Sequence, residues 1–256
     1  MSHASNSPAR DCGANMRLLD LTLDTAARNL ALDEALLDEA EENAAPREVL
    51  RLWESPEFAV IVGRSSSVSQ EVDAEYCAKK GMPILRRCSG GASVLVGPGC
   101  LMYSLVLSYE LRPALRMIEE THAFVLERLA KCLDPLCPGQ ISHRGISDLT
   151  LRDRKVSGNS LRCKRGHLLY HGTLLYDFPL ELIGSCLRTP PRQPDYRAGR
   201  NHLNFVANLP ASSVQLRAML EQGWNVERTE EDWPRENTLF LAQQRYEQSS
   251  WNLRRD

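Results

Sequence analysis

Two arginines and two glycines lie close together in the segment Arg86-Arg87-Cys88-Ser89-Gly90-Gly91-Ala92-Ser93-Val94. Arginine carries a permanent positive charge and a planar fork of N–H donors. Glycine lets the backbone approach a ligand closely and present its own N–H groups. The segment therefore predicts an anion-binding loop, with phosphate as the expected anion. A plain turn beside a solvated arginine pair would use the same residues.

A lysine and a histidine follow further along the chain, each close to a glycine. Lys155 opens the run Lys155-Val156-Ser157-Gly158-Asn159-Ser160 after a charged turn, and His171 precedes Gly172. A lysine at the start of a strand can point into a cleft, and a glycine inside a strand indicates close approach of a ligand or another backbone. We therefore expect Lys155, Gly158 and His171 at a binding site. An exposed hairpin lysine and a buried, hydrogen-bonded histidine are the competing interpretations.

Hydrophobic periodicity predicts the elements that must position these residues. A helix over residues 24–42 is expected to begin at Asp24 and to carry its acidic residues on its outer face. Residues 48–53 and 58–62 are predicted to pair as a hairpin around Ser55-Pro56. The further predicted strands are 18–23, 82–86, 101–108, 148–151, 156–160 and 168–176, and the further predicted helices are 72–80, 113–133, 179–187, 214–222 and 236–247.

The order of these elements determines the expected fold class. Short strands in hairpins, with helices between them, do not give a strict βαβ alternation. They predict an α+β fold with a mixed, mostly antiparallel sheet flanked by helices. A chain of 256 residues is long enough for one large core. We expect a flexible N-terminal segment over residues 1–15 and one domain over residues 16–256.

Composition argues against several classes of protein. Lys and Arg number 31 against 33 Asp and Glu, and the resulting net charge of -2 does not favour a nucleic-acid-binding protein. No apolar run is long enough to cross a membrane and no signal segment is present, so we expect no membrane partner and a cytoplasmic location. The 8 cysteines include no Cys-x-x-Cys pair, which argues against a zinc knuckle. Without export, we expect the thiols to be reduced. Cys77 and Cys132 are expected in the core, and Cys88 is a candidate nucleophile.

Positive charge gathers over residues 144–165, where seven Lys and Arg residues stand against two Asp residues. A basic surface beside an anion-binding loop suits a phosphorylated ligand or an acidic partner protein. A solvated hairpin face would have the same composition.

Taken in order, the three clusters resemble the lipoate–protein ligase A family, of the biotin/lipoate ligase superfamily. The resemblance is carried by FAVIVGR at residues 58–64, RRCSGGASVLV at 86–96, SDLTLRDRKVSGNS at 147–160 and YHGTLLYD at 170–177. Tyr246 and the run Ser250-Trp251-Asn252 resemble the end of the family's catalytic domain. The resemblance covers residues 16–256 and implies a fold like that of class II aminoacyl-tRNA synthetases and biotin protein ligases. It implies a catalytic domain without the C-terminal accessory domain that many members carry.

The resemblance also implies an activity, namely ATP-dependent activation of lipoate or octanoate and transfer of the acyl group to a lysine of a lipoyl domain. Lys155 would be the catalytic residue, between the acyl oxygen and the α-phosphate, because two anions must be neutralised before they react. Asp148 would orient Lys155 or bind Mg²⁺, the usual partner of ATP phosphates. The other residues implied to bind nucleotide or acyl group are Arg87, Ser89, Gly90, Gly91, Ala92, Ser93, Val94, Leu95, Gly158 and His171.

The sequence departs from the family pattern at the nucleotide end of the site. Ala92 and Ser93 stand where the family has Gly and Ala, Val96 replaces a histidine, Gly97 replaces an acidic residue, and Ser147 replaces an asparagine. Together with the missing accessory domain, these changes leave two routes open. The chain could act with a separate accessory chain, or it could take an acyl group that is already activated.

Three alternatives remain on the same fold. An octanoyltransferase would hold the acyl group as a cysteine thioester. The corresponding region, residues 138–141, contains no cysteine, and neither Cys137 nor Cys88 matches the expected position. A lipoyl-AMP transferase needs no thiol, and a degenerate member would bind acyl groups or partner proteins without catalysis.

Overall fold

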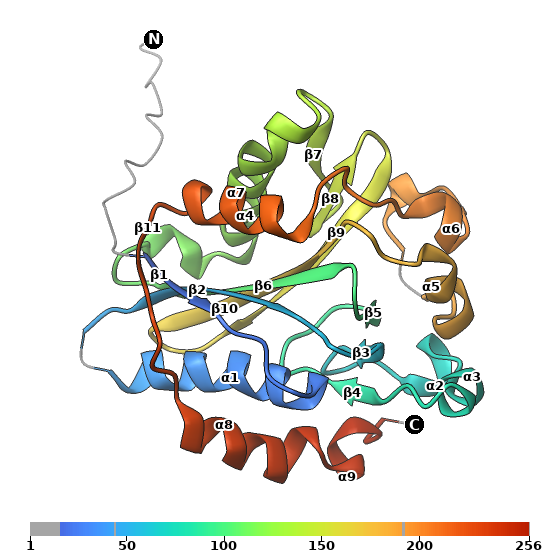
Figure 1. Ribbon diagram of the computed structural model, residues 1–256, viewed down its shortest axis with the longest axis horizontal. Helices are drawn as coiled ribbons and strands as arrows, with labels where there is room; N and C mark the ends of the chain where they lie inside the picture. The colour runs from blue at the N-terminus through green and yellow to red at the C-terminus, as the bar shows by residue number, and fades with distance from the viewer. Residues whose placement is uncertain (1–15, 44, 191–192, 256) are drawn as a thin grey trace.

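An eight-stranded sheet forms the centre of the molecule, in the order β11-β1-β2-β6-β10-β9-β8-β7 (Figure 1). The computed structural model describes residues 16–255 except 44, 191 and 192, so the predicted flexible segment 1–15 lies outside the described residues. β1 pairs in parallel with β11 and β2, and the other neighbouring strands are antiparallel. The strands are β1 (Met16–Asp20), β2 (Glu48–Glu54), β6 (Cys100–Ser108), β7 (Ile141–Arg144), β8 (Asp148–Leu151), β9 (Arg154–Cys163), β10 (His167–Leu175) and β11 (Val226–Thr229).

The two middle strands carry the most hydrophobic stretches of this sheet. Every residue of β6 and of β10 is buried. Strands covered on both faces have continuous hydrophobic runs instead of an alternating pattern, and both strands fit this description. The predicted α+β fold with a mostly antiparallel sheet is therefore confirmed.

Helices cover both faces of the sheet, as Figure 1 shows. On one face, α4 and α7 contribute Leu129, Leu216 and Trp224 to the core. On the other face, α1 packs through Leu32 and Leu36, and α8 packs against the far side of α1. The helices are α1 (Ala26–Glu42), α2 (Val68–Glu71), α3 (Ala74–Lys79), α4 (Ile118–Leu133), α5 (Leu180–Cys186), α6 (His202–Phe205), α7 (Ser213–Gly223), α8 (Arg235–Leu241) and α9 (Ser249–Asn252).

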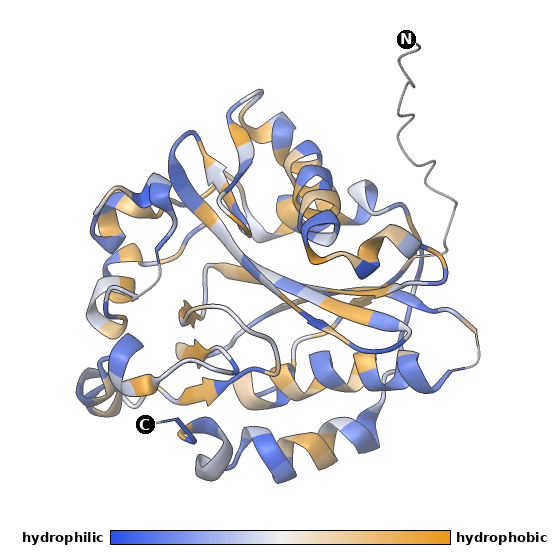
Figure 2. Ribbon diagram, turned by 180° about the vertical axis from the view of Figure 1, so that it is seen from behind, coloured by the Kyte–Doolittle hydropathy of each residue, from blue (hydrophilic) through white to orange (hydrophobic). Residues whose placement is uncertain are grey.

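A second, three-stranded sheet has the order β4-β3-β5 and consists of β3 (Ala59–Val62), β4 (Ile84–Arg86) and β5 (Val94–Val96). Its strands are almost entirely hydrophobic (Figure 2). The predicted hairpin of residues 48–53 and 58–62 is wrong, because β2 lies in the large sheet and β3 in the small one. β2 lies between β1 and β6, and β3 lies between β4 and β5, so each strand has partners on both edges.

The first helix differs from its prediction at its start and on its outer face. Thr25, one residue after the predicted Asp24, is the N-cap, and its side chain accepts a hydrogen bond from the Arg28 N–H. Asp33 and Glu34 were expected on the outer face, but they are 1% and 2% exposed. Both carboxylates have basic partners inside the protein, which makes their burial possible.

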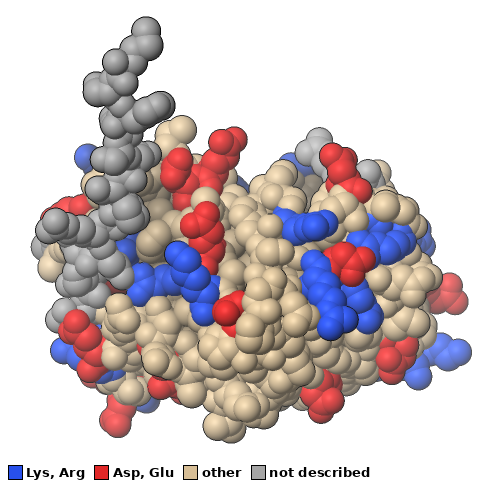
Figure 3. All heavy atoms as spheres, turned by 90° about the horizontal axis from the view of Figure 1, so that it is seen from above, with Lys and Arg blue, Asp and Glu red and all other residues tan. Residues whose placement is uncertain are grey.

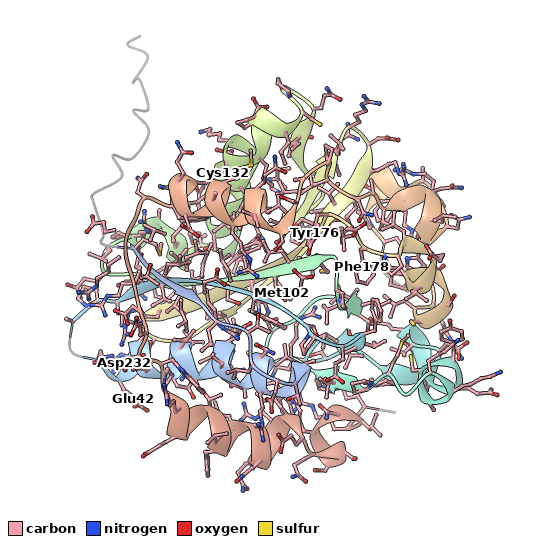
Figure 4. All side chains as sticks on the ribbon, in the orientation of Figure 1. Glu42, Met102, Cys132, Tyr176, Phe178 and Asp232 are labelled. Carbon is pink, nitrogen blue, oxygen red and sulfur yellow. The ribbon has the colours of Figure 1, made fainter. Side chains whose placement is uncertain are left out.

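The helix predicted over residues 113–133 is divided. A 3-10 turn occupies Pro113–Arg116, and α4 begins at Ile118. Cys77 is buried as predicted, whereas Cys132 is only partly buried, between α4 and the end of α7 (Figure 4). Strands β7 and β11 were not predicted. They are edge strands with few buried residues, and their hydrophobic pattern is correspondingly weak.

The C-terminal helix α9 packs against β4, just before the Arg-Gly segment. The backbone N–H of Arg86 donates to the Asn252 side chain at 2.9 Å, and the indole N–H of Trp251 donates to the Arg86 carbonyl at 2.7 Å. Arg86 and the residues of α9, which are more than 160 positions apart in the chain, therefore hold each other in place. Among the described residues, no helix is both long and apolar enough to cross a membrane.

Candidate active site

Two adjoining cavities lie between the two sheets. The larger has a volume of about 700 Å³, and the smaller, toward α5 and α6, of about 140 Å³. Leu30, Ile61 and Met102 line the larger cavity and are nearly inaccessible, so they form its deep, apolar end. Met102 is labelled in Figure 4, on the central strand β6. Both cavities are bordered by Ala92, Ser93, Val94, Lys155, Gly158, Thr173 and Pro194.

Lys155 lies where the cavities meet. Its Nζ is 2.7 Å from Oδ1 of Asp148, and its side chain is 26% exposed. The second oxygen of Asp148 accepts a hydrogen bond from the Tyr196 hydroxyl at 2.7 Å. Burial, followed by the charge of Asp148, raises the pKa of Tyr196, so this phenol stays a donor at neutral pH. The lysine is thus a cation held by one carboxylate, within reach of both cavities.

Backbone geometry allows this ion pair. Asp148 on β8 is paired with Gly158 on β9, and the register shifts between Leu149 and Thr150. A Cβ on Gly158 would lie 2.8 Å from the Lys155 Nζ. Gly158 therefore leaves the space that the lysine crosses to reach Asp148.

Arg87 holds the loop that it precedes. Its guanidinium donates to the carbonyls of Ile61, Gly90 and Ala92 and to the Ser89 hydroxyl. Burial lowers the pKa of Arg87 to about 10, which still leaves it charged at neutral pH. The hydrogen bonds of Arg87 shape the loop, whereas its contact with phosphate stays a prediction.

The loop also has a carboxylate partner that the sequence did not suggest. Oε2 of Glu71, at the end of α2, accepts from the Ser93 N–H at 2.7 Å and from the Ser93 hydroxyl at 2.8 Å. Gly91 has a φ of +83°, a conformation that favours glycine. Together these features fix the path of the loop beside Lys155.

His171 connects the larger cavity to a buried charge network. Its Nε2 lies 2.5 Å from the Ser89 hydroxyl, and its Nδ1 lies 3.5 Å from Oδ2 of Asp33. The other oxygen of Asp33 accepts from Arg51 at 2.5 Å. Burial alone would raise the pKa of Asp33, but Arg51 and His171 hold it below its usual value. The network keeps a negative charge behind the imidazole.

The seven cysteines that the structure describes lie away from the cavities. In the described part of the chain, no cysteine lines either cavity. Cys88 is 2% exposed, and burial raises its pKa to about 12, so it is a thiol at neutral pH. Cys88 is therefore a core residue despite its place in the loop segment.

The predicted basic surface of residues 144–165 is not one patch. β9 is an extended strand, at about 3.3 Å per residue, and separates Arg154 at one end from Arg162 at the other. Arg162 lies 3.8 Å from Glu34, and Lys164 pairs with Asp38. Basic side chains do gather on the side that carries α5 and α6, on the right of Figure 3.

Most of the predicted site residues lie together. Ser89 and Gly90 border neither cavity, Leu95 borders only the smaller one, and the others border the larger. Sequence reasoning missed Asp33, Glu71 and Tyr196. For Asp33 a signal existed, since a carboxylate inside the apolar run ALDEALL requires a partner if that face is buried. Glu71 and Tyr196 come from segments without a motif.

Comparison with known proteins gives a family and several relatives. The model of the lipoyl protein ligase A/B catalytic domain family matches residues 25–232. An Aeropyrum pernix protein assigned as a lipoate-protein ligase A is 33% identical over 148 residues, 57% of this chain and 52% of the relative. The octanoyltransferase LipM of Anoxybacillus flavithermus is 24% identical over 276 residues, 93% of this chain and 98% of the relative. The chain thus spans about half of the first relative's length.

Solved structures share the fold. A chain from the bi-partite lipoate protein ligase of Thermoplasma acidophilum, analysed with its E2 lipoyl domain, has a TM-score of 0.78 at 21% identity, covering 94% of this chain and 97% of the other. A lipoate-protein ligase A bound with ATP has a TM-score of 0.75 at 22% identity, covering 94% and 99%. The family match extends over far more than half of the sequence, and this protein belongs to the lipoyl protein ligase A/B catalytic domain family.

Proposed function

We propose that this protein is a lipoate–protein ligase, which activates lipoate or octanoate with ATP and transfers the acyl group to a lysine of a lipoyl domain. The observation that carries the proposal is the position of Lys155, whose ammonium group borders both cavities. The named relatives include ligases and octanoyltransferases, and one structural neighbour was solved with ATP.

In the first step, an oxygen of the acyl carboxylate attacks the α-phosphorus of ATP, and pyrophosphate leaves with the electron pair of the broken P–O bond. Lys155 reduces the repulsion between these two anions, because its charge can be shared by the carboxylate and the α-phosphate. The apolar deep end of the larger cavity suits the hydrocarbon part of the acyl group. In the second step, the neutral amine of the acceptor lysine attacks the acyl carbon, AMP leaves, and an amide and one proton are formed.

Asp148 would give Mg²⁺ one ligand, in exchange for part of its contact with Lys155 or Tyr196. One carboxylate is sufficient for Mg²⁺ when nucleotide phosphates supply further ligands, and Asp148 borders the larger cavity beside Lys155. The described residues contain no cluster of three metal-ligating side chains, so a metal held by protein alone does not fit. Bound there, Mg²⁺ would neutralise part of the phosphate charge.

The thioester route has less support. It needs a thiolate at the acyl site, and the described cysteines lie outside both cavities. We expect Cys88→Ser to keep most of the wild-type activity, because this thiol is buried and protonated. Complete loss of activity with an intact fold would favour a thiol mechanism.

An octanoyltransferase activity is the second candidate, because the likeness to LipM covers nearly the whole of both chains. The two activities differ in the donor that they accept. The protein is incubated with ATP, Mg²⁺ and lipoate, with and without a lipoyl domain, and pyrophosphate and the acceptor mass are measured. Pyrophosphate release and an acylated acceptor support the ligase, whereas transfer only from octanoyl-acyl carrier protein supports the transferase. Binding of acyl ligand without reaction would indicate a degenerate member.

A separate accessory chain is part of the proposal. The Thermoplasma relative is described as bi-partite, and its subunit 1 is 24% identical to this chain over 245 residues. If transfer requires such a chain, adenylate formation and acceptor acylation will separate, with the second appearing only when a candidate accessory chain is added.

A further inference from the structure

Arg197, at the end of the 3-10 turn Asp195–Arg197, is a buried cation without a carboxylate partner among the described residues. Arg197 as a whole residue is 3% exposed. Its Nε donates to the Arg200 carbonyl at 2.9 Å, and its guanidinium carbon lies 4.8 Å from the centre of the Phe205 ring. Its Nη2 has no hydrogen-bond partner.

Such an arrangement costs stability in the free protein, because a buried charge is normally neutralised by a partner. Several other arginines have partners: the donors of the buried Arg87 go to carbonyls and a hydroxyl, and two arginines pair with carboxylates. Arg51 is buried against Asp33, and Arg200, three positions after Arg197, pairs with Asp153 at 2.9 Å. Burial also lowers the pKa of Arg197, as expected for a cation that lacks a compensating anion.

The residues around Arg197 indicate which kind of ligand would neutralise its charge. It lines the smaller cavity together with Lys155 and Arg188. Glu71 is the carboxylate in that lining, and its Oε2 is already bonded to the backbone and hydroxyl of Ser93. The charged residues in the described lining of the smaller cavity therefore carry more positive than negative charge. The rest of the lining is mostly apolar, so an anionic group is expected at the charged residues and not throughout the cavity.

We propose that Arg197 binds the phosphates of the nucleotide, including the pyrophosphate that leaves when the acyl-adenylate forms. The inference rests on the proposed ligase function. The α-phosphate reacts beside Lys155, and the acyl chain occupies the larger cavity. The remaining phosphates then extend into the smaller cavity, where the planar guanidinium can contact two phosphate oxygens at once.

The test measures binding of inorganic pyrophosphate, in buffer with Mg²⁺, to the full chain by titration calorimetry. Arg197→Gln is expected to weaken this binding by about tenfold or more, as for the loss of a charge-assisted hydrogen bond. Arg197→Lys keeps the positive charge but not the planar set of N–H donors. Its affinity for pyrophosphate should lie between those of the wild type and Arg197→Gln. Arg152→Gln is the control: it removes one positive charge from an exposed turn, where Arg152 bonds to Gln140 and borders neither cavity. It should bind pyrophosphate within about twofold of wild type.

Two further readouts separate binding from folding. Arg197→Gln should keep wild-type affinity for lipoate, and pyrophosphate should raise the melting temperature of the wild type more than that of the variant. The inference is overturned if Arg152→Gln loses as much affinity, if Arg197→Gln loses affinity for adenosine but not for pyrophosphate, or if the wild type binds no pyrophosphate. Pyrophosphate binding through Arg197 without adenylate formation would overturn the ligase proposal alone.

Discussion

At the scale of single residues, the site depends on the absence of a Cβ atom at Gly158. Lys155 and Asp148 lie on neighbouring strands, and the lysine crosses the glycine to reach the carboxylate. The side chain that carries the proposed chemistry is thus positioned by a missing Cβ as much as by its ion pair.

Replacing Lys155 with alanine tests the proposed catalytic role. We expect Lys155→Ala to abolish adenylate formation, because the two anionic reactants lose the cation between them. Release of pyrophosphate in the presence of lipoate measures this step. Lys164→Ala is the control, since Lys164 is a lysine just beyond the other end of β9 that pairs with Asp38 and borders neither cavity. Near wild-type release by Lys155→Ala would remove this residue from the mechanism.

Gly158→Ala tests the positioning without removing the cation. The added Cβ would lie 2.8 Å from Nζ, so the lysine must move. We expect a loss of about tenfold or more in kcat, because small displacements of catalytic groups have effects of this order. Gly184→Ala is the matched control, because a Cβ there meets nothing within 4 Å. Equal activities of the two variants would contradict the proposed steric role.

Motif residues could be predicted from sequence, whereas their supporting partners could not. Lys155, Gly158 and His171 stand in short runs with a recognisable spacing. Their supports, Tyr196, Glu71 and Asp33, come from distant segments, and no local pattern says which carboxylate or hydroxyl meets which loop. Arg87 shows the same limit, because its residue type indicates positive charge but not that its donors go to backbone carbonyls.

At the scale of elements, α1 is joined to β2 by a buried ion pair beneath the site. Arg51 on β2 donates to Asp33 on α1, and His171 on β10 lies on the other side of that carboxylate. Three elements therefore share one charge, and the helix cannot shift along the sheet without breaking this contact.

Asp33→Asn should lower the free energy of unfolding at pH 7 by about 3 kcal/mol, because it leaves a buried guanidinium without its anion. Asp38→Asn, on the same helix, removes one partner of a partly exposed pair and should cost less than about 1 kcal/mol. Denaturant unfolding of both variants measures the difference. Equal costs would show that the buried network does not stabilise the fold.

The same pair gives a pH dependence of stability. The folded-state pKa of Asp33 lies below its usual 3.8, so its charged form contributes stability above that pH. This contribution is lost as the pH falls below 3.8 toward the folded-state pKa. Wild-type stability should therefore fall more steeply in acid than that of Asp33→Asn. Parallel curves for the two proteins would contradict this assignment.

The sequence predicted the strands themselves better than it predicted which strands pair with each other. The runs at 48–53 and 58–62 were correctly predicted as strands but wrongly paired with each other. Adjacent strands often form hairpins, but β2 pairs with β1 and β6, whereas β3 pairs with β4 and β5. Most of these partner strands lie far away in the sequence, and hydrophobic periodicity does not indicate which distant strands pair.

At the scale of the whole molecule, two cavities meet at one lysine. On the proposed function, the acyl and nucleotide ligands would occupy different cavities and meet at this residue. Asn252→Leu tests the contribution of the C-terminal end. It leaves the buried Arg86 N–H without its acceptor, and we expect a loss of about 1–3 kcal/mol in stability and a higher KM for ATP. Arg255→Ala, an exposed change nearby, should alter neither.

The contact between α9 and β4 has a consequence for biosynthesis. A ribosome delivers residues 84–86 long before residues 251–252, which supply hydrogen bonds to Arg86. Until residues 251–252 have emerged, the strand that leads into the predicted anion-binding loop lacks these bonds. We therefore expect this loop to reach its final conformation only after residues 251–252 have left the ribosome.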